Sequence, residues 1–308
     1  MDIKSFDFRE AIGLELGGVT ITRLLGRGAM GAVFVAFQKS LKRQVAVKLL
    51  PKTVATTDLS RQQFRDEAET IAALSHPYII PIFEMGEHEK YYYQVMQLVQ
   101  GSDLNVVVRN RLKHPVPSKR LLPVAFTLDM VSKVLDGLGY AHDEGVVHQD
   151  IKPANILLEQ RSLRPLIADF GIAKTAQLEY KAQGLIVGTP MYLAPEQASA
   201  AETDRRADVY SVGVILFEML AGMLPLRQES ARQLLVRKVK MPDTVYVKRP
   251  SEASPLIDAD LERIVLKAIA PNRDERYPDC GQFRAAVEKY RAALPAPRAP
   301  AQEGPEHG

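Results

Sequence analysis

The sequence predicts an α+β fold with two lobes, a small one rich in β-strands followed by a larger one that is mainly helical. Between about residues 17 and 98, apolar and polar residues alternate in several short stretches, which is typical of half-buried strands. After Gly101 the apolar residues recur three or four positions apart, which is the spacing of amphipathic helices. A chain of 308 residues is long enough for two domains or one bilobed unit.

The first lobe is expected to span residues 17–99 and to contain five strands and one helix. Helical spacing covers residues 60–74, where Phe64, Ala68 and Ile71 share a face and Ser60 can cap the first turn. Residues 1–16 form a lead-in whose order the sequence does not determine. The strands are expected at residues 19–22, 32–36, 44–49, 79–83 and 91–98.

The second lobe is expected to span residues 100–294 and to be built around one buried helix. Residues 209–220 are apolar nearly all round, which indicates a helix covered on every side. The tail, residues 295–308, is rich in Pro, Ala and Gly and has too little apolar area to offset ordering entropy, so we expect a disordered end or a linker. Three amphipathic stripes are expected to pack around the buried helix, at residues 128–138, 261–268 and 283–290.

Composition excludes several classes of protein. The chain is 46% hydrophobic and 25% charged, with a net charge of +3 spread along it, which is ordinary for a globular protein and argues against nucleic-acid binding. Cys280 is the one cysteine, so no internal disulfide can form. No uncharged apolar stretch reaches eighteen residues, so no membrane span is expected. We expect a cytoplasmic location, for the chain alone or as the cytosolic module of a longer membrane-anchored or multidomain protein.

A glycine-rich string, Gly26-x-Gly28-x-x-Gly31-x-Val33, lies between the first two expected strands. Glycines let backbone amides approach phosphate groups without a Cβ in the way. Alone, the string also fits a tight hairpin or the turn of a dinucleotide-binding fold, which needs a helix directly afterwards. Because residues 32–36 have the pattern of a strand, a flap over the phosphates of ATP is favoured.

Lys48 is a single lysine on an otherwise apolar strand, in the run Val45-Ala46-Val47-Lys48. Such a lysine is often a snorkelling edge residue, and a helix carboxylate such as Glu67 is often simply solvated. Glu67 follows nineteen positions later on the expected helix. Given the glycine-rich string before it, Lys48 is predicted to face the phosphates and to pair with Glu67.

The segment His148-Gln149-Asp150-Ile151-Lys152-Pro153-Ala154-Asn155, followed by Asp169-Phe170-Gly171, contains the groups that phosphoryl transfer requires. Asp150 can orient a hydroxyl, and Lys152 can bind the γ-phosphate. Asn155 and Asp169 can hold Mg²⁺. A single Asp or Asn in a loop is commonly a turn former, but four such groups at these spacings favour catalysis.

In this order, the motifs closely resemble the eukaryotic-type protein kinases, and most of all the bacterial Ser/Thr kinases. The resemblance runs from Gly26 to Arg276 and includes Gly188-Thr189-Pro190-Met191-Tyr192-Leu193-Ala194-Pro195-Glu196 and Asp208-x-Tyr210-Ser211-x-Gly213. It implies the bilobed protein-kinase fold and transfer of the γ-phosphoryl group of ATP to Ser/Thr hydroxyls of protein substrates, with Mg²⁺ or possible Mn²⁺. It also implies that Glu196 pairs with Arg276 and that Asp208 braces the catalytic loop.

The resemblance assigns further residues to the site. Val33, Ala46 and Leu157 would sandwich the adenine, Met96 would be the gatekeeper, and backbone groups of Gln97 and Val99 would bind the adenine edge. Thr189 would accept a hydrogen bond from Lys152 and approach Asp150, and Lys152-Pro153 matches the Ser/Thr-specific form. A column that links the lobes would contain Ile71, Ile82, His148 and Phe170.

Gln149 departs from the family pattern, which has Arg at this position. In many kinases that Arg pairs with a phosphorylated residue of the activation segment, and a neutral Gln cannot do so. Residues 181–187, just before Gly188, also contain no Ser or Thr and no Tyr. We therefore hypothesise that activity does not depend on activation-loop phosphorylation; the alternative is a neutral substitution.

Three other functions share part of this pattern. A nucleotide-binding pseudokinase scaffold has no chemical reason to keep Lys48, Glu67, Asp150, Lys152 and Asp169 together. A small-molecule kinase would lack the flap glycines and the Ala194-Pro195-Glu196 segment. A catalytic module of a larger receptor fits the chain equally well, and whether it forms a homodimer is left open.

Overall fold

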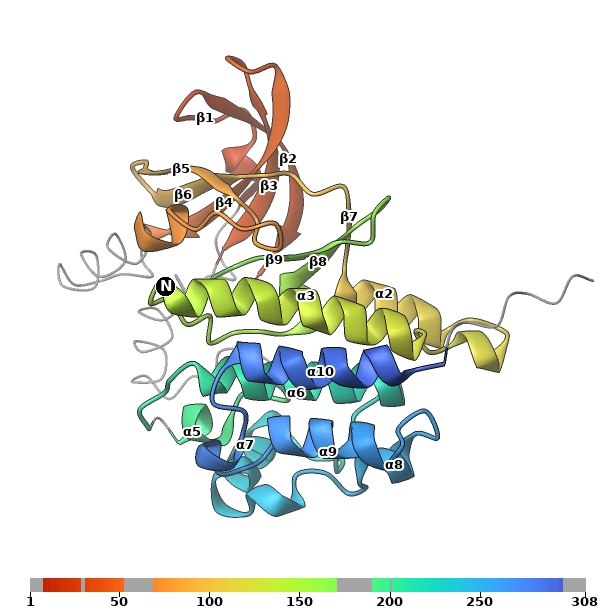
Figure 1. The fold of residues 1–308 in the computed structure, drawn as a ribbon. Helices are drawn as coiled ribbons and strands as arrows, with labels where there is room; N and C mark the ends of the chain where they lie inside the picture. The colour runs from red at the N-terminus through yellow and green to blue at the C-terminus, as the bar shows by residue number, and fades with distance from the viewer. Residues whose placement is uncertain (1–7, 29–30, 53–68, 171–189, 200, 296–308) are drawn as a thin grey trace, which may run out of the picture.

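The structure is a computed structural model that describes residues 8–28, 31–52, 69–170, 190–199 and 201–295. It confirms the predicted α+β fold with two lobes. Figure 1 shows the twisted sheet of the first lobe above the stacked helices of the second. Glu67 and Thr189, and the tail from residue 296, lie outside the described residues.

The first lobe is a six-stranded antiparallel sheet. Its strand order is β1-β2-β3-β4-β6-β5. β4 and β6 are buried along most of their length because they occupy the middle of the sheet. The strands are β1 (Glu15–Leu16), β2 (Val19–Arg27), β3 (Ala32–Gln38), β4 (Arg43–Pro51), β5 (Ile82–Glu87) and β6 (Tyr91–Met96).

Two details of the first lobe differ from the sequence prediction. The strand expected at residues 79–83 begins at Ile82, and Ile79 forms only an isolated bridge with Ile167. Pro81 has no N–H to donate to a strand ladder, so regular pairing starts after it. The sixth strand, β1, lies in the lead-in, where the sequence predicted no element.

The end of the lead-in packs onto the sheet. Residues Phe8–Ala11 form a short 3₁₀ helix, and both end residues are buried. The Phe8 ring lies 6.5 Å from that of Phe34 and 6.4 Å from that of Tyr91, measured between centroids. From residue 8 onward the chain therefore contributes to the core of the first lobe.

The second lobe starts with a small antiparallel sheet of order β7-β8-β9 and continues as a stack of helices. The three strands are β7 (Gly101–Asp103), β8 (Ile156–Glu159) and β9 (Pro165–Ile167). The helices are α2 (Leu104–Leu112), α3 (Val124–Asp143), α5 (Pro195–Ala198), α6 (Arg206–Ala221), α7 (Ala231–Lys240), α8 (Pro250–Ala253), α9 (Ala259–Ala268) and α10 (Cys280–Ala293), with 3₁₀ turns at Pro117–Lys119, Pro153–Asn155, Pro242–Thr244 and Arg273–Glu275.

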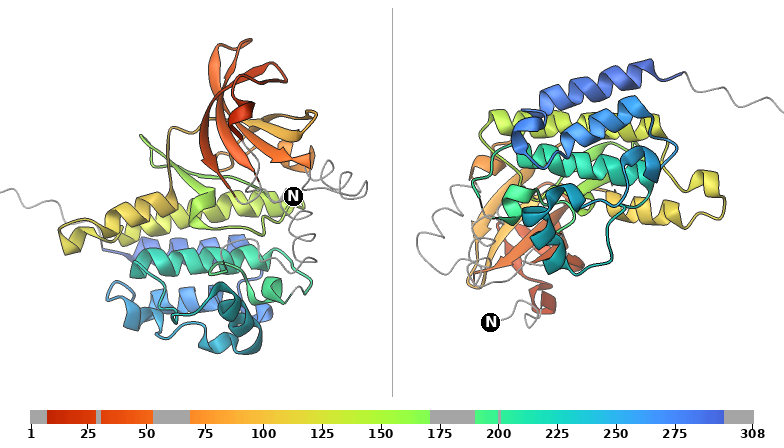
Figure 2. Two further views of the ribbon diagram at one scale, coloured as in Figure 1. Left: turned by 180° about the vertical axis from the view of Figure 1, so that it is seen from behind. Right: turned by 90° about the horizontal axis from the view of Figure 1, so that it is seen from below.

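Helix α6 is the buried helix that the sequence predicts. It is enclosed by α3, α9 and α10 (Figures 1 and 2), and almost every residue from Ala207 to Leu220 is buried. The helix ends at Gly222, which has a φ of 81° and whose N–H donates to the carbonyl of Glu218. A left-handed glycine is a common helix terminator.

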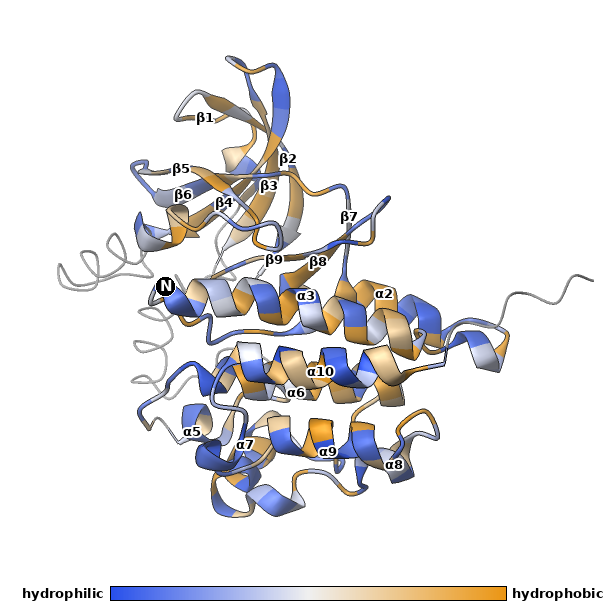
Figure 3. Ribbon diagram, in the orientation of Figure 1, coloured by the Kyte–Doolittle hydropathy of each residue, from blue (hydrophilic) through white to orange (hydrophobic). Residues whose placement is uncertain are grey.

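The predicted amphipathic stripes also face the core. Leu128, Leu135 and Leu138 on α3 are buried, as are Leu261 and Val265 on α9. Figure 3 shows hydrophilic and hydrophobic residues interspersed along α3, α9 and α10. None of the helices within the described residues is long and apolar enough to cross a membrane.

Close packing of α6 on α9 makes Gly213 a sensitive position. A Cβ there would lie 2.6 Å from Cβ of Ala268 and 2.9 Å from Cγ2 of Ile269. Gly213→Ala should therefore lower the free energy of unfolding by about 1–3 kcal/mol, although alanine in a helix is favoured by about 1 kcal/mol over glycine. Urea unfolding followed by circular dichroism measures this.

Gly139→Ala on α3 is the matched control. Its new Cβ would lie an ordinary 3.7 Å from Cβ of Cys280, so this variant should be as stable as the wild type or more stable. An unfolding midpoint for Gly213→Ala at or above that of the wild type would contradict the packing argument.

Candidate active site

The catalytic loop, residues 148–155, connects α3 to β8 and positions Asp150. Lys152 Nζ donates to Asp150 Oδ2 over 2.6 Å. Asn155 Nδ2 donates to the backbone carbonyl of Asp150 over 2.8 Å and to Oδ2 over 3.2 Å. Because both side chains contact Oδ2, the other carboxylate oxygen is the one suited to accept a hydrogen bond from a substrate hydroxyl.

Asp208, fully buried near the start of α6, holds the backbone of this loop. Its carboxylate accepts hydrogen bonds from the backbone N–H groups of His148 and Gln149 and from the His142 ring, each 2.8 Å long. Burial alone would raise the pKa of Asp208, but the contact with His142 and the amide of Gln149 lower it, so the carboxylate stays ionised. The predicted bracing role of Asp208 is confirmed.

The same contacts allow an unusual backbone conformation at Gln149. Its φ is +64°, a left-handed value that costs a side-chain-bearing residue energy unless its surroundings fix it. The side chain of Gln149 stands where the family that the sequence resembles has Arg, but it is the peptide N–H and carbonyl that make the described contacts.

Lys48 and Asp169 come together between the lobes. Lys48 Nζ lies 2.8 Å from Asp169 Oδ1, and the Lys48 side chain is 18% exposed. Burial would raise the pKa of Asp169, but the neighbouring ammonium of Lys48 outweighs this and lowers it. Sequence reasoning assigned Lys48 and Asp169 to separate tasks and missed this contact, since no spacing rule connects them.

Two members of the column predicted to link the lobes are in direct contact. The ring centroids of His148 and Phe170 are 4.7 Å apart, and His148 Nε2 lies 2.9 Å from the carbonyl of Ala168. Ile71 and Phe170 belong to the same buried cluster, and Ile82 packs against it. These contacts hold the chain just before and after Asp169, the residue predicted to bind the metal ion.

A separate apolar cluster, which we call the cleft cluster, surrounds the predicted adenine site. Its buried members are Ala46, Ile80, Met96 and Leu166. Ala46 and Met96 are directly opposite each other on β4 and β6. Sequence reasoning missed Ile80 and Leu166, whose short apolar runs gave no sign of facing the cleft. Packed against the cluster are Val33, Ile82, Leu98, Val99, Leu157 and Ala168.

The chain after Met96 is arranged to leave one group of Gln97 for a ligand. The backbone N–H of Gln97 donates to the carbonyl of Pro81 over 3.1 Å. Its own carbonyl is therefore the group suited to accept a hydrogen bond from an adenine amino group. The use of backbone groups at Gln97 and Val99 to bind adenine stays a prediction.

The glycines of the flap have different roles. A Cβ at Gly31 would lie 2.1 Å from the carbonyl oxygen of Leu49, so only glycine allows β3 and β4 to approach this closely. Within the part of the chain that the structure describes, a Cβ at Gly26 would meet nothing within 4 Å, and one at Gly28 only the carbonyl of Gly31 at 3.8 Å. Gly26 and Gly28 therefore leave open space where phosphate groups could approach the backbone.

The donor set suits Mg²⁺. Among the described residues, no group of three or more His, Cys, Asp or Glu side chains could hold a metal ion by itself. Asn155 and Asp169 offer hard oxygen ligands, and Mg²⁺ is commonly bound by one or two protein oxygens together with substrate phosphates and water. The residues present therefore fit an ion that arrives with a nucleotide.

The segment from Pro190 to Gln197 is fixed to the second lobe and to the catalytic loop. Arg276, whose side chain is fully buried, makes two bonds of 2.7 and 2.8 Å to the Glu196 carboxylate, which confirms the predicted pair. Gln197 Nε2 donates to the carbonyl of Gln149 over 2.8 Å, and its Oε1 accepts from the N–H of Ala194 over 3.0 Å. Sequence reasoning missed this role of Gln197.

Comparison with protein families matches residues 19–285 to the protein kinase domain. The chain belongs to the protein kinase family. It is 34% identical to the serine/threonine-protein kinase Pkn1 of Myxococcus xanthus, over 90% of this chain and 39% of that protein. It is 33% identical to the serine/threonine-protein kinase PknB of Mycobacterium leprae, over 93% of this chain and 44% of that protein. The chain therefore spans about two fifths of these relatives.

Solved structures agree with this assignment. The kinase domain of PknI from Mycobacterium tuberculosis superposes with a TM-score of 0.73 and is 29% identical, over 92% of this chain and 99% of that one. The predicted resemblance to bacterial Ser/Thr kinases is thus confirmed. The predicted pair of Lys48 with Glu67 and the role of Thr189 lie outside the described residues and stay predictions.

The three hydrogen bonds to Asp208 predict the effect of removing its charge. In Asp208→Asn an amide N–H₂ replaces one oxygen and would face a donor, so the catalytic loop should lose its fixed position. We expect kcat to fall about 10- to 100-fold, which corresponds to one or two lost hydrogen bonds. Asp258→Asn, at the N-cap of α9, is the control, and it should leave kcat unchanged because Asn caps helices well.

The same variant should change the response to acid. Folding lowers the pKa of Asp208, so its contribution to stability is complete above its unfolded-state pKa of about 4. That contribution is lost as the pH falls through the lower folded-state pKa. In Asp208→Asn the free energy of unfolding should lack this part of its decrease at low pH. If both kcat and the pH dependence of unfolding were the same as in the wild type, the bracing role would be contradicted.

Proposed function

We propose that this chain transfers the γ-phosphoryl group of Mg-ATP to Ser or Thr hydroxyls of proteins. The observation that carries the proposal is the convergence of two clusters at the junction of the lobes. One cluster is Lys48 with Asp169, and the other is Asp150 with Lys152 and Asn155. The cleft cluster beside them supplies an apolar surface for a planar base. Positioning and charge stabilisation are what phosphoryl transfer mainly requires.

Each side chain has a defined task in this proposal. Asp150 orients the acceptor hydroxyl through the oxygen that does not face Lys152. Lys152, held 2.6 Å from Asp150, can follow the negative charge that develops on the transferred group. Asn155 and Asp169 would hold the metal ion, which, when bound, neutralises charge on the phosphate oxygens. Lys48 adds a second cation on the nucleotide side of the site.

The proposal also covers two residues outside the described part of the chain, the metal ion and the setting of the protein. Glu67 is proposed to orient Lys48, and Thr189 to shape the acceptor side of the site beside Lys152. Mg²⁺ is the proposed ion, with Mn²⁺ as a possible substitute, because both accept oxygen ligands. A cytoplasmic location and the possible homodimer also belong to the proposal, as does the view that this domain serves a longer protein.

The first test is transfer of the γ-phosphoryl group from ATP to dephosphorylated casein. Asp150→Asn should lower kcat by about 10²- to 10⁴-fold because it removes the group that orients the hydroxyl, while ATP still binds. Lys48→Met should lower kcat/KM for ATP by a similar factor. Lys39→Met removes an exposed lysine of the first lobe and is the matched control.

Two outcomes would contradict the proposal. One is wild-type protein that binds Mg-ATP but transfers nothing, which would support the pseudokinase scaffold. The other is full activity in Asp150→Asn. Titration with Mg-ATP shows whether the nucleotide binds in each case, and binding is measured as an increase in the melting temperature of the protein.

We further propose that activity does not depend on phosphorylation of the activation segment. Gln149 cannot bind a phosphate group as Arg would. The segment from Ala194 to Gln197 is instead linked to the catalytic loop by a neutral bond from Gln197 to the carbonyl of Gln149. The buried pair of Glu196 with Arg276 adds a permanent charged contact. These contacts need no modification to form.

Phosphatase treatment tests this second proposal. Protein dephosphorylated completely, as verified by intact mass, should keep its kcat within about twofold because neutral contacts hold the segment. A matched test is Gln149→Arg, which restores a cation but should bring no dependence on phosphate by itself. A loss of more than tenfold that autophosphorylation restores would refute the proposal.

A further inference from the structure

Lys238, on α7, is a fully buried lysine outside the catalytic cluster. Burying a lysine is unfavourable unless its nitrogen finds hydrogen-bond partners. Lys238 Nζ donates to the backbone carbonyls of Met191 over 2.7 Å and Leu193 over 2.6 Å. It also lies 5.0 Å from the centroid of the Tyr210 ring on α6, a favourable distance for a cation–π contact.

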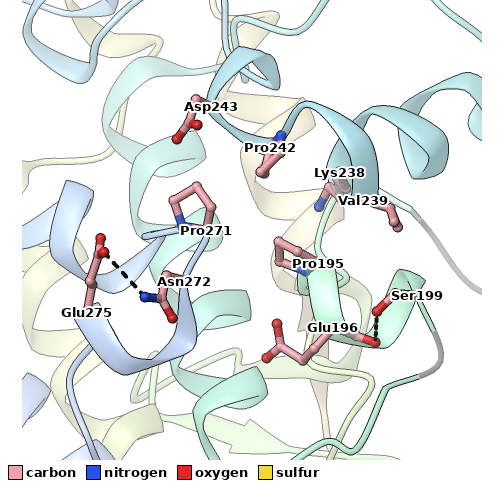
Figure 4. Close-up of a pocket in the computed structure, with 10 residues that line it drawn as sticks. All are labelled: Pro195, Glu196, Ser199, Lys238, Val239, Pro242, Asp243, Pro271, Asn272 and Glu275. Carbon is pink, nitrogen blue, oxygen red and sulfur yellow. Dashed lines mark hydrogen bonds between the residues drawn. The ribbon is translucent and has the colours of Figure 1, made fainter.

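The carbonyl between these two is held in the same way. Ser211 Oγ, on α6, donates to the carbonyl of Tyr192 over 2.9 Å. Three consecutive carbonyls, from Met191 to Leu193, are thus bound by side chains of α6 and α7. Because these three carbonyls are hydrogen-bonded to side chains of the second lobe, the path of the backbone from residue 191 to 193 is fixed. Figure 4 shows Lys238 on α7 facing α5, where Pro195 and Glu196 lie.

This segment borders the catalytic loop. Gln197 connects it to the carbonyl of Gln149, the residue directly before Asp150. A polypeptide that brings a hydroxyl to Asp150 must therefore lie against the segment that Lys238 holds. In the proposed reaction ATP would lie beside Lys48 and Asp169, and its binding would not depend on this surface.

We propose that Lys238 is a positioning residue for the protein acceptor: by holding the carbonyls of Met191 and Leu193, it fixes the surface against which the acceptor chain binds. This proposal rests on the proposed function, since it concerns the acceptor of the same transfer reaction. Lys238 touches neither the acceptor nor ATP and acts through the backbone of residues 191–193.

The contact does not require a charged lysine. Burial, followed by the nearby guanidinium of Arg276, lowers the pKa of Lys238 to about 7, while the carboxylate of Glu196 raises it. A neutral amine still has two N–H groups, one for each carbonyl. Both hydrogen bonds can therefore persist on either side of neutral pH, and the role of Lys238 follows from its donors.

The test compares Lys238→Met with Lys240→Met in the full chain. Both remove a lysine from α7, but Lys240 is exposed. In Lys238→Met the KM for dephosphorylated casein should rise about tenfold or more, because two backbone carbonyls lose their donors. The KM for ATP and the slow hydrolysis of ATP by water should stay within twofold of the wild type. Lys240→Met should match the wild type in all three.

Hydrogen exchange provides a readout independent of catalysis. The amides of residues 190–197 should exchange faster in Lys238→Met and not in Lys240→Met. Wild-type protein that transfers nothing to casein would overturn the proposed function and with it the acceptor role, and exchange would then report only whether Lys238 holds the segment. An unchanged KM for casein in folded Lys238→Met would overturn the positioning role while the proposed function stands.

A general structural role predicts a different result. In that case ATP hydrolysis, the KM for ATP and casein phosphorylation would all decline together in Lys238→Met, which would also overturn the proposal. If Lys238→Met does not fold, Lys238→Gln keeps an amide donor for one carbonyl, and its KM for casein is the deciding measurement: an increase supports the proposal and wild-type behaviour refutes it.

Discussion

The site depends first on one buried carboxylate. Asp208 accepts three hydrogen bonds of 2.8 Å, two of them from consecutive backbone amides of the catalytic loop. A buried charge is stable only when hydrogen-bond donors surround it. In turn, the loop amides keep their orientation only while the carboxylate is there to accept their hydrogen bonds. Helix α6, which carries Asp208, is buried among other helices. The catalytic loop is therefore held in place by the core of the second lobe.

A second set of contacts extends this rigidity to the segment that follows the activation loop. Lys238 and Ser211 hold its carbonyls, Arg276 holds its carboxylate, and Gln197 returns to the catalytic loop. Each is a side chain bonded to backbone or to a buried charge, and such bonds have little freedom to exchange partners. Preorganised polar groups of this kind lower the cost of arranging a reaction at the moment it occurs.

The sequence predicted the parts of the site that are determined by local spacing. The loop from His148 to Asn155, the buried helix and the glycine-rich flap follow from short-range patterns. Lys238 and Gln197 did not, because their partners lie about 45 residues away in the chain and are backbone atoms, which carry no residue signature. Periodicity alone placed the start of one strand too early, because Pro81 delays regular pairing until Ile82. Ile80 and Leu166 required knowledge of which faces meet across the cleft.

The two clusters of the candidate site are anchored differently. Among the described residues, Asp150 is held by neighbours within the second lobe, whereas Asp169 meets a lysine of the first lobe. A hinge movement of the lobes would stretch the contact between Lys48 and Asp169 and leave the surroundings of Asp150 intact. In the proposed reaction, spent nucleotide would then be exchanged for fresh nucleotide while the surface proposed to receive the protein stays in place.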